Sequence, residues 1–489
     1  MKTWKCEICG YIHNGEEPPS PCPACGADRE LFSIFEIHLE PPALVKTDDW
    51  QCGICDHLHH GSEPPDSCPV CSSPGHLFKP QLNESLVGPC GTDIHTVIIV
   101  GAGIAGVTAA AEARRNSPDV AITILSREPA PPYFRLNLTR YLAGDVTEPE
   151  MCMQTQQWFD EQRIGFLVAD VTSVDRENRL VSIRDGLKIP YDRLVLANGA
   201  HPFIPPIPGA TREGVHVLRT REDAHAIESR LNSATNVVCI GGGLLGLETA
   251  GALARHSVNV TVIEGFAWLL PRQMTPPAGK LLQQRLETQG ITIRCGIKVM
   301  EIIGDESVYG VLLDTGDELP ADIVIIAAGV RPNSHIARQS GLKVNNGVVV
   351  DDRMCTSDPS IFAAGDVAEH FGKLYGIWPA SYAQGIVAGN NAIGGHAEFN
   401  GVAPSNRIKV LDIDLFSIGQ IQPEDASTII HEDQHDNTYR ALFCRDGQLV
   451  GAVLYGETSI AGLLKEAVES RRQISEIPEL DLLISKSNS

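Results

Sequence analysis

Four Cys-x-x-Cys pairs near the start of the chain are the residues with the clearest chemistry. The stretch "CEICGYIHNGEEPPSPCPACG" contains two pairs, and "CGICDHLHHGSEPPDSCPVCS" contains two more. Two short loops that each offer two thiolates build a tetrahedral sulfur site, which suits zinc or a single iron, and the spacing alone does not separate these metals. The candidate metal ligands are Cys6, Cys9, Cys22 and Cys25 in the first stretch, and Cys52, Cys55, Cys68 and Cys71 in the second.

The two stretches belong to a tandem repeat with an offset of 46 residues. The repeat extends beyond the cysteines, because Trp4 corresponds to Trp50 and Phe32 to Phe78. Self-similarity of this kind indicates two copies of one small unit. We place module 1 at residues 1–35 and module 2 at residues 48–80.

The residues beside the cysteines bear on the choice of metal. In module 1 a glycine follows each pair, where backbone N–H groups can turn toward the sulfurs and tune the potential of a redox metal. In module 2, Asp56 and Ser72 replace these glycines, and His57 replaces Tyr11. The segment "WKCEICGYIHNGEEPPSPCPACGADRELF" resembles a short-form rubredoxin of the kind found in rubrerythrins. This resemblance implies one Fe(Cys)4 centre per module that carries single electrons, with structural zinc as the alternative, especially in module 2.

Two glycine-rich fingerprints follow the modules. "TVIIV" precedes "GAGIAG" and "NVVCI" precedes "GGGLLG", and a helical pattern follows each. A strand, G-x-G-x-x-G and a helix in this order form a dinucleotide site, in which the helix N-terminus meets the pyrophosphate. Two such units predict an α/β protein with two nested Rossmann-like domains. The candidate cofactor-binding residues are Gly101, Gly103, Ile104, Ala105 and Gly106 in the first fingerprint, and Gly241, Gly243 and Gly246 in the second.

Acidic residues end the second strand of each unit. Glu264 ends "NVTVIE", where a carboxylate binds ribose hydroxyls and repels a 2′-phosphate, so this site is expected to take NADH. In the first unit Glu128 is the candidate for the adenosine ribose of FAD, although a slip of two residues along this strand stays open. Glu248 is a candidate for positioning the nicotinamide, and its alternative is a helix-start carboxylate.

Four further segments resemble two-dinucleotide flavoproteins. These are "YDRLVLANGAHPFIPPIPG", "ADIVIIAAGVRPN", "CTSDPSIFAAGDVAEH" and "PPYFRLNLTRYLAG". The last is similar to a flavin-contacting stretch of NADH:rubredoxin reductases and of the NADH-binding part of nitrite reductases. The resemblance implies that Asp366 holds the ribityl chain of FAD and that Arg135 and Arg140 meet its phosphate, with surface arginines as the alternative. Gly199 and Gly329 lie in the paired strand-and-glycine segments.

The same resemblance sets the expected domain layout. The FAD domain comprises residues 95–212 and 331–395, and the NAD domain comprises residues 213–330. Residues 401–489 are expected to form a small α+β domain for packing or dimer contact. Module 2 is nearer to the FAD domain along the chain and is expected to dock there first.

Composition excludes several classes of function. The net charge of −22 argues against nucleic acid and anionic membranes as partners. No apolar run approaches the length of about 18 residues that a membrane span needs, and no apolar leader precedes the first cysteine, so a cytoplasmic protein is expected. No cysteine lies between Gly106 and Met151, where a disulfide reductase would carry its redox pair.

These observations predict an NADH-dependent flavoprotein reductase. Electrons are expected to pass from NADH through FAD to two iron centres, and then to an external redox protein such as a rubrerythrin or a flavodiiron protein, in oxygen or peroxide detoxification. No side-chain acid or base is required. The alternatives are an NADH oxidase or peroxidase, or a redox-sensing scaffold, each with zinc in the modules. The sequence leaves open whether the chain forms a homodimer.

Overall fold

The computed structural model describes most of the chain beyond the N-terminal modules and parts of each module. The residues described are 2–6, 11–23, 27–34, 49–52, 58–60, 65, 78–80, 94–402, 405–410, 413–422, 427–435 and 437–478. Cys9, Cys25, Cys55, Cys68 and Cys71 lie outside these ranges.

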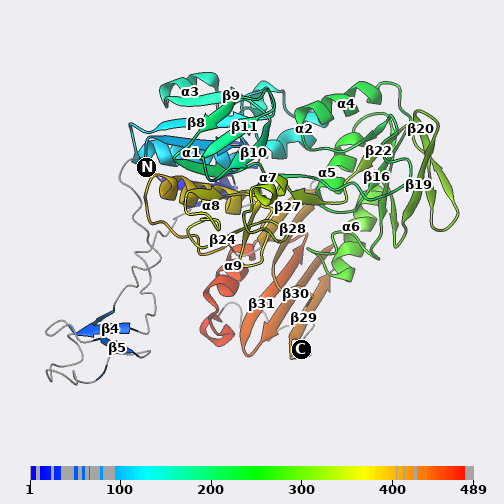
Figure 1. The fold of residues 1–489 in the computed structure, drawn as a ribbon. Helices are drawn as coiled ribbons and strands as arrows, with labels where there is room; N and C mark the ends of the chain where they lie inside the picture. Colours follow the sequence, from blue (N-terminus) through cyan, green and yellow to red (C-terminus); the bar gives the residue numbers. More distant parts are fainter. Residues whose placement is uncertain are drawn as a thin grey trace.

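A five-stranded parallel sheet forms the centre of the FAD domain, in the order β25-β13-β7-β8-β9. Its residues are apolar in continuous runs because both faces are covered, as in the fully buried "RLVL" of β13. Two helices, α1 and α8, pack against one another beside it (Figure 1). The bounds are β7 Thr96–Val100, β8 Ala121–Ser126, β9 Ile164–Val168, β13 Arg193–Leu196, β25 Ile361–Ala363, α1 Ile104–Asn116 and α8 Trp378–Ala392.

The NAD domain repeats this plan. Its parallel sheet has the order β15-β22-β16-β17-β18, with the fingerprint strand again at the centre. Each domain also carries a three-stranded antiparallel sheet, β10-β11-β12 in the first and β19-β20-β21 in the second. The bounds are β15 Val215–His216, β16 Asn236–Ile240, β17 Asn259–Glu264, β18 Thr292–Cys295, β22 Ile323–Ile326, α4 Arg221–Leu231, α5 Leu244–Leu253, α6 Pro276–Thr288, β10 Val171–Asp175, β11 Leu180–Ile183, β12 Lys188–Pro190, β19 Val299–Gly304, β20 Val308–Leu313 and β21 Glu318–Pro320.

The chain passes between the two nucleotide domains on a pair of antiparallel strands, β14 (Ala200–Pro202) and β23 (Val330–Pro332). Two asparagines beside them exchange hydrogen bonds. Asn198 Nδ2 donates to Asn333 O at 2.8 Å, and Asn333 Nδ2 donates to Asn198 O at 2.6 Å. Each asparagine side chain therefore donates a hydrogen bond to a backbone carbonyl on the other of the two connections between the domains. We call this pair the asparagine clasp.

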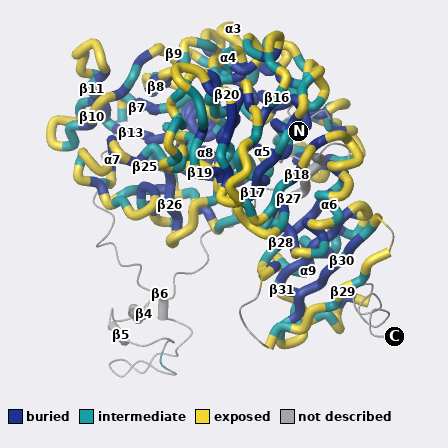
Figure 2. Tube along the Cα trace, turned by 90° about the vertical axis from the view of Figure 1, so that its right-hand side faces the viewer, coloured by how far each residue is buried: buried dark blue, intermediate teal, exposed yellow. Residues whose placement is uncertain are grey.

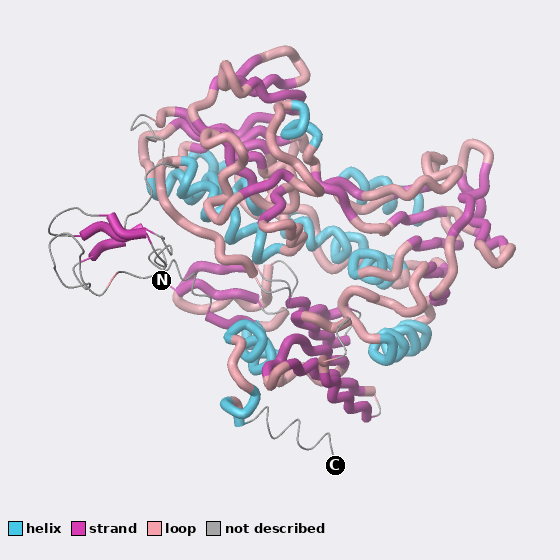
Figure 3. The backbone as a smooth tube through the Cα atoms, turned by 60° about the horizontal axis from the view of Figure 1, so that its bottom comes forward, coloured by secondary structure: helices cyan, strands magenta, loops and turns pink. Residues whose placement is uncertain are grey.

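The C-terminal domain is an antiparallel sheet in the order β27-β28-β31-β30-β29. Its apolar side chains alternate between two faces: Leu415 and Phe443 pack with the NAD domain, whereas Phe416 and Leu442 pack with α9. Figure 3 accordingly shows the sheet between two helices. Tyr439 accepts a hydrogen bond from Thr275, next to α6, at 2.8 Å. The bounds are β27 Ser405–Val410, β28 Ile413–Gly419, β29 Ile429–His435, β30 Thr438–Arg445, β31 Gln448–Tyr455 and α9 Ala461–Ser470.

The two N-terminal modules each form a three-stranded sheet with the same order and register. Module 1 has the order β2-β1-β3, and module 2 has the order β5-β4-β6. Cys6 pairs with Phe32 in module 1, and Cys52 pairs with Phe78 in module 2, so the 46-residue repeat extends to the strand register. The bounds are β1 Lys2–Cys6, β2 Ile12–Gly15, β3 Phe32–Ile34, β4 Asp49–Cys52, β5 Leu58–His60 and β6 Phe78–Pro80.

These sheets confirm the predicted α/β class with two Rossmann-like domains, two small N-terminal modules and a C-terminal domain. Figure 2 shows the central strands buried, whereas the edge strand β29 is exposed along most of its length. Among the described residues, no helix has the length and apolar character needed to cross a membrane. Smaller elements are β26 Ala368–His370, α2 Leu138–Leu142 and α3 Gln156–Glu161.

The asparagine clasp should contribute measurably to stability. We expect Asn333→Ala to leave the Asn198 carbonyl without its partner at a half-buried position, which costs about 1–2 kcal/mol. For a domain of this size, that cost corresponds to a lower melting temperature by about 2–4 °C per kcal/mol. Thermal unfolding followed by circular dichroism measures the shift. The exposed Asn232 at the end of α4 supplies the control, and an equal shift in Asn232→Ala would contradict the clasp.

Candidate functional site

The first fingerprint has the backbone shape that a pyrophosphate needs. Gly101 has a φ of 109°, and a Cβ there would lie 2.3 Å from Ala197 O. A Cβ on Gly106 would lie 1.9 Å from Gly101 O, so this glycine lets α1 approach the turn. Gly103 faces open space within 4 Å. The cradle therefore fits a pyrophosphate at the start of α1, where Ile104 and Ala105 offer backbone N–H groups.

The second fingerprint repeats this geometry almost atom for atom. Gly241 has a φ of 117° and lies against Ala327 O, and a Cβ on Gly246 would lie 2.0 Å from Gly241 O. Gly243 again faces open space. The α5 helix starts at Leu244 and directs its N–H groups toward this space. Both predicted dinucleotide cradles are thus formed by the backbone.

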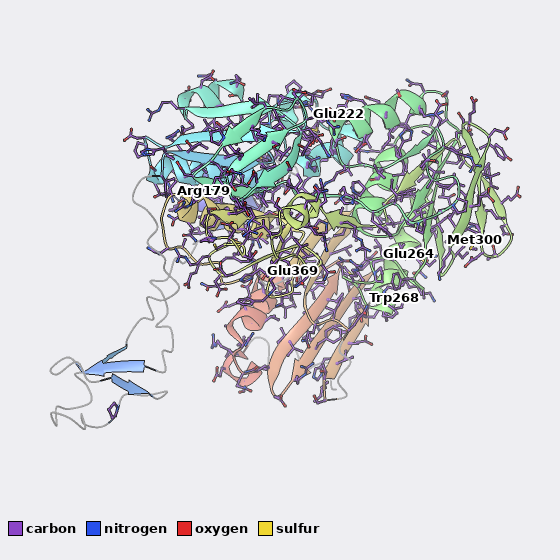
Figure 4. All side chains as sticks on the ribbon, viewed as in Figure 1. Arg179, Glu222, Glu264, Trp268, Met300 and Glu369 are labelled. Atoms are coloured by element: carbon purple, nitrogen blue, oxygen red, sulfur yellow. The ribbon has the colours of Figure 1, made fainter. Side chains whose placement is uncertain are left out.

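Glu264 is built into the second cradle. Its carboxylate is buried and accepts hydrogen bonds from Gly242 N and Phe266 N, each at 2.7 Å. Figure 4 places Glu264 in the NAD domain, at the end of β17. A negative charge fixed beside the glycines stands where the adenosine ribose of a dinucleotide binds.

The corresponding acid of the first cradle is arranged differently. The bonds Gly101 N–Leu125 O and Gly241 N–Ile263 O, both 2.8 Å, make Ser126 the structural counterpart of Glu264. Glu128 lies two residues further along. Its carboxylate accepts hydrogen bonds from Tyr133 Oη and from Arg135, each at 2.6 Å. Contact of Glu128 with the FAD ribose stays a prediction.

A half-buried shell of charged groups connects the flavin-contacting stretch with Asp366. Arg135 donates to Glu128 and also to the backbone carbonyl of Arg219. The Arg219 guanidinium in turn pairs with Asp366 at 2.9 Å. We call these residues the arginine shell. The sequence analysis missed Tyr133 and Arg219, because Arg219 lies 147 residues before Asp366 and no motif joins them.

The region around Asp366 also has unfilled hydrogen-bonding capacity. Gly365 N donates to Gln384 Oε1 at 2.8 Å, whereas Nε2 of the buried Gln384 has no partner in the structure. The indole Nε1 of Trp378, at the start of α8, also has none. Buried donors of this kind are normally satisfied, so their position beside Asp366 and the fingerprint helix fits a bound polar group such as FAD.

The other predicted residues lie at the edges of this site. Arg140 on α2 donates to Asn137 Oδ1 at 3.3 Å rather than joining the arginine shell. Gly199 and Gly329 have φ values of 64° and 99° and flank the strands of the domain crossing. Their contact with a cofactor stays a prediction, as does the phosphate role of Arg140.

Glu248 has the most perturbed carboxyl group of the site. It lies on α5 and is half-buried, and it hydrogen-bonds Thr139 on α2. Burial raises the pKa of Glu248 to about 7, and the hydrogen bond from Thr139 opposes this shift. A carboxyl group at the contact of the FAD and NAD domains that titrates near neutrality is compatible with a role toward the nicotinamide.

Module 1 has matching backbone hydrogen bonds at its two described cysteines. Cys6 N donates to Tyr11 O at 2.7 Å, and Cys22 N donates to Ala27 O at 2.8 Å, so both turns close over the same number of residues. Cys6 and Cys22 are both buried in the cluster between the module and the FAD domain. Paired turns that bring thiols into one buried site fit a tetrahedral metal centre.

Module 1 packs directly on the FAD domain. Its buried cluster includes Tyr11 and continues into Phe134, Met153 and Trp378. Asn137 Nδ2 donates to Pro23 O at 3.0 Å. The expectation that module 2 docks first is therefore wrong for this structure, where β4 and β5 lie apart from the nucleotide domains (Figure 1). Proximity along the chain favours module 2, but within the part of the chain that the structure describes the contacts with the FAD domain are made by module 1.

The remaining described cysteines offer no reactive thiol pair. Burial raises the pKa of Cys239 to about 12 and those of Cys295, Cys355 and Cys444 to about 11. Thiols with such pKa values stay protonated and unreactive at neutral pH. Cys152 lies beside Tyr133 in the backbone, and its thiol donates to Gln154 O at 3.2 Å. Among the described residues, electrons have no dithiol route away from the flavin site.

Two nested dinucleotide folds, each with a formed cradle, define a two-dinucleotide oxidoreductase. Residues 95–385 match the family "Pyridine nucleotide-disulphide oxidoreductase", and the chain belongs to this family. Residues 404–472 match "Rubredoxin NAD+ reductase C-terminal domain". Residues 4–33 and 50–79 each match "Rubrerythrin, rubredoxin-like domain", which supports the predicted fusion of two rubredoxin-like modules to a flavoprotein.

Individual relatives cover the body of the chain. The nitrite reductase [NAD(P)H] of Bacillus subtilis is 36% identical over 392 residues, which is 79% of this chain and 49% of the relative. This chain thus spans about half the length of that relative. The rubredoxin-NAD(+) reductase of Ectopseudomonas oleovorans is 36% identical over 56% of this chain and 71% of its own length. The structure of NADH:rubredoxin oxidoreductase from Clostridium acetobutylicum superposes with a TM-score of 0.71 at 28% identity, over 80% of this chain and 99% of that one.

The raised pKa of Glu248 predicts a pH-dependent stability. Because the folded-state pKa of about 7 lies above the usual 4.5, the folded protein binds more protons than the unfolded chain between these values. The contribution of Glu248 is fully present below pH 4.5 and is lost as the pH rises through 7. Glu248→Gln should remove this pH dependence. Relative to wild type, the free energy of unfolding of the variant should therefore rise by on the order of 1–3 kcal/mol between pH 5 and 8.

Melting temperatures measured across this pH range test the assignment. Glu466→Gln, at an exposed site on α9, is the matched control and should follow the wild-type profile. Parallel profiles for wild type and Glu248→Gln would show that Glu248 titrates normally.

Proposed function

We propose that this chain is an NADH-dependent FAD reductase that delivers electrons to thiolate-bound iron in its own N-terminal modules. An external redox protein, such as a rubrerythrin or a flavodiiron protein, then receives them. The observation that carries this proposal is the burial of Cys6 and Cys22 in one cluster with Phe134 and Trp378 of the FAD domain. A metal-ligand cluster packed on a flavin domain is what an internal electron acceptor requires.

The names of the relatives support the same reaction class. One solved structure is described as an NADH:rubredoxin oxidoreductase, and one relative as a rubredoxin-NAD(+) reductase. In both descriptions, a rubredoxin is the electron partner. Here two rubredoxin-like modules lie on the same chain as the reductase. Covalent attachment replaces diffusion by an effective concentration near the millimolar range.

The residues of this chain would divide the binding work. The first cradle, the arginine shell and Asp366 would hold FAD, which when bound supplies hydride acceptance and single-electron release. The second cradle and Glu264 would hold NADH. Glu248 and Thr139, at the contact of α5 with α2, would set the position of the nicotinamide. The raised pKa values of the buried cysteines favour this reading over a thiol peroxidase.

Glu264 should give the enzyme a preference for NADH over NADPH. A 2′-phosphate beside a buried carboxylate meets like-charge repulsion, and Gly242 N already donates to that carboxylate. We expect a preference on the order of 10- to 100-fold in kcat/KM. Glu264→Gln should reduce this preference, mainly by lowering kcat/KM for NADH. Steady-state rates with each cofactor test this, and equal use of NADPH by the wild type would place Glu264 away from the ribose.

The metal in the modules decides between a reductase with internal acceptors and an oxidase with structural zinc. We expect about two irons per chain, one for each set of four cysteines. Anaerobic NADH should bleach the visible ferric-thiolate absorption together with that of the flavin. The change Cys22→Ser should remove about half of the iron. Two zinc ions per chain, or iron that NADH leaves oxidised, would contradict the proposal.

A further inference from the structure

We propose that module 1 is the acceptor that docks at the flavin side, and that Tyr11 selects module 1 over module 2. This inference rests on the proposed function for its redox meaning, but the docking itself stands on contacts between described residues. It reverses the order expected from sequence proximity.

The contact consists of an aromatic cluster and one hydrogen bond from a side chain to a backbone carbonyl. The Tyr11 ring meets Phe134 edge-on, with centroids 5.3 Å apart and an interplanar angle of 78°. Phe134 in turn packs on Trp378, with centroids 5.6 Å apart. The bond from Asn137 Nδ2 to Pro23 O fixes a second point. Asn137 is fully buried, so loss of this partner would be costly. We call Phe134, Asn137 and Trp378 the docking seat.

Both contact points of module 1 belong to its cysteine turns. Tyr11 closes the first turn, because its carbonyl accepts from Cys6 N. Pro23 follows Cys22 directly in the second turn. The module therefore presents both turns to the seat, and the buried Cys6 and Cys22 lie in the same cluster as Phe134. In this orientation, a metal held by these cysteines would lie on the side of module 1 that faces the FAD domain.

The docking seat is continuous with the candidate flavin site. Phe134 lies between Tyr133 and Arg135, which both bind Glu128. Arg135 continues through Arg219 to Asp366. Trp378 begins α8, and the Oγ atom of Ser381, one turn later, lies 3.7 Å from where a Cβ on Gly365 would stand. The seat and the cofactor shell thus share neighbouring residues on the same elements.

Module 2 lacks one of the two contacts. At the 46-residue offset, Pro69 stands in place of Pro23, so the sequence keeps a proline at this position in both copies. His57, however, stands in place of Tyr11. An imidazole is smaller and more polar than a phenol ring, so a histidine in the place of Tyr11 would cover less of Phe134. Aromatic pairs of this type attract one another more strongly than their buried area alone accounts for. Tyr11 is therefore the residue that selects module 1 over module 2.

The redox step that this docking serves is balanced by the proposed activity. If each module holds one iron, one NADH would supply the two electrons that both ferric irons need, with NAD+ and a proton as the other products. Module 1 takes each electron at the seat. Module 2, which leaves the seat to module 1, is then the copy positioned to meet the external acceptor.

Hydrogen–deuterium exchange of the full-length holoprotein tests the docking without relying on turnover. In Tyr11→Ala we expect the amides of residues 134–138 and 378–382 to exchange roughly tenfold faster, as expected for loss of an aromatic pair and its buried area. His57→Ala is the matched control and should leave these segments unchanged. Tyr11→Phe should retain the wild-type protection, because the ring contact persists.

A swap variant tests selectivity directly. Tyr11→His combined with His57→Tyr should restore protection of the seat and move the protected amides from module 1 to module 2. Asn137→Ala, which leaves both modules untouched, should also increase exchange of module 1 amides. Unchanged exchange in both Tyr11→Ala and Asn137→Ala, or equal effects of Tyr11→Ala and His57→Ala, would overturn the proposal.

Metal content of the same samples separates this inference from the proposed function. Iron retained in Tyr11→Ala shows that module 1 is still folded, so that faster exchange reports undocking. Zinc in the wild type together with normal seat protection would end the proposed electron transfer while leaving the docking intact. Iron that NADH reduces, together with an unprotected seat in wild type, would overturn the docking alone.

Discussion

The asparagine clasp is the constraint on which the rest of the structure depends. The chain leaves the FAD domain on β14 and returns on β23, and Asn198 and Asn333 lock these crossings by exchanging bonds to backbone carbonyls. Contacts between the domains are set by this lock. Arg219, at the start of the inserted domain, meets Asp366 of the FAD domain, and Glu248 on α5 meets Thr139 on α2. Alignment of two bound cofactors requires that these domains keep one orientation.

Charge inside the site is stabilised by mutual pairing. Arg135 and Arg219 are matched by Glu128 and Asp366, and the Tyr133 hydroxyl completes the set. Removing one member would leave an uncompensated charge at a half-buried position, which costs more than an exposed ion pair contributes. The same pairing fixes the ring of Phe134 between two tethered neighbours. A surface that receives a small module therefore gains its rigidity from the shell behind it.

Sequence reasoning succeeded where function requires a fixed local spacing. The glycines of both fingerprints and the four cysteine pairs are read from short motifs, and the positive φ values of 109° at Gly101 and 117° at Gly241 leave few other residues acceptable. It failed where contacts join distant segments. No pattern connects Arg219 to Asp366 or Tyr11 to Phe134, since both pairs form only after the domains pack. Chain proximity favours module 2 in the docking order, whereas the contacts seen in the described residues are those of Tyr11 and Pro23 in module 1.

Because module 1 packs on the FAD domain, the chain between module 1 and β7 is held at both of its ends. The docked module 1 is one of these fixed ends and β7 is the other. Module 2 lies between them in the sequence. Closing such a loop of about 60 residues costs on the order of 3–4 kcal/mol of chain entropy, which the aromatic seat has to offset. A segment whose two ends are both held explores a smaller volume than a segment held at one end only. If the proposed function holds, a chain segment held at both ends would keep module 2 within reach of the FAD domain, at a distance set by chain length and not by its own affinity.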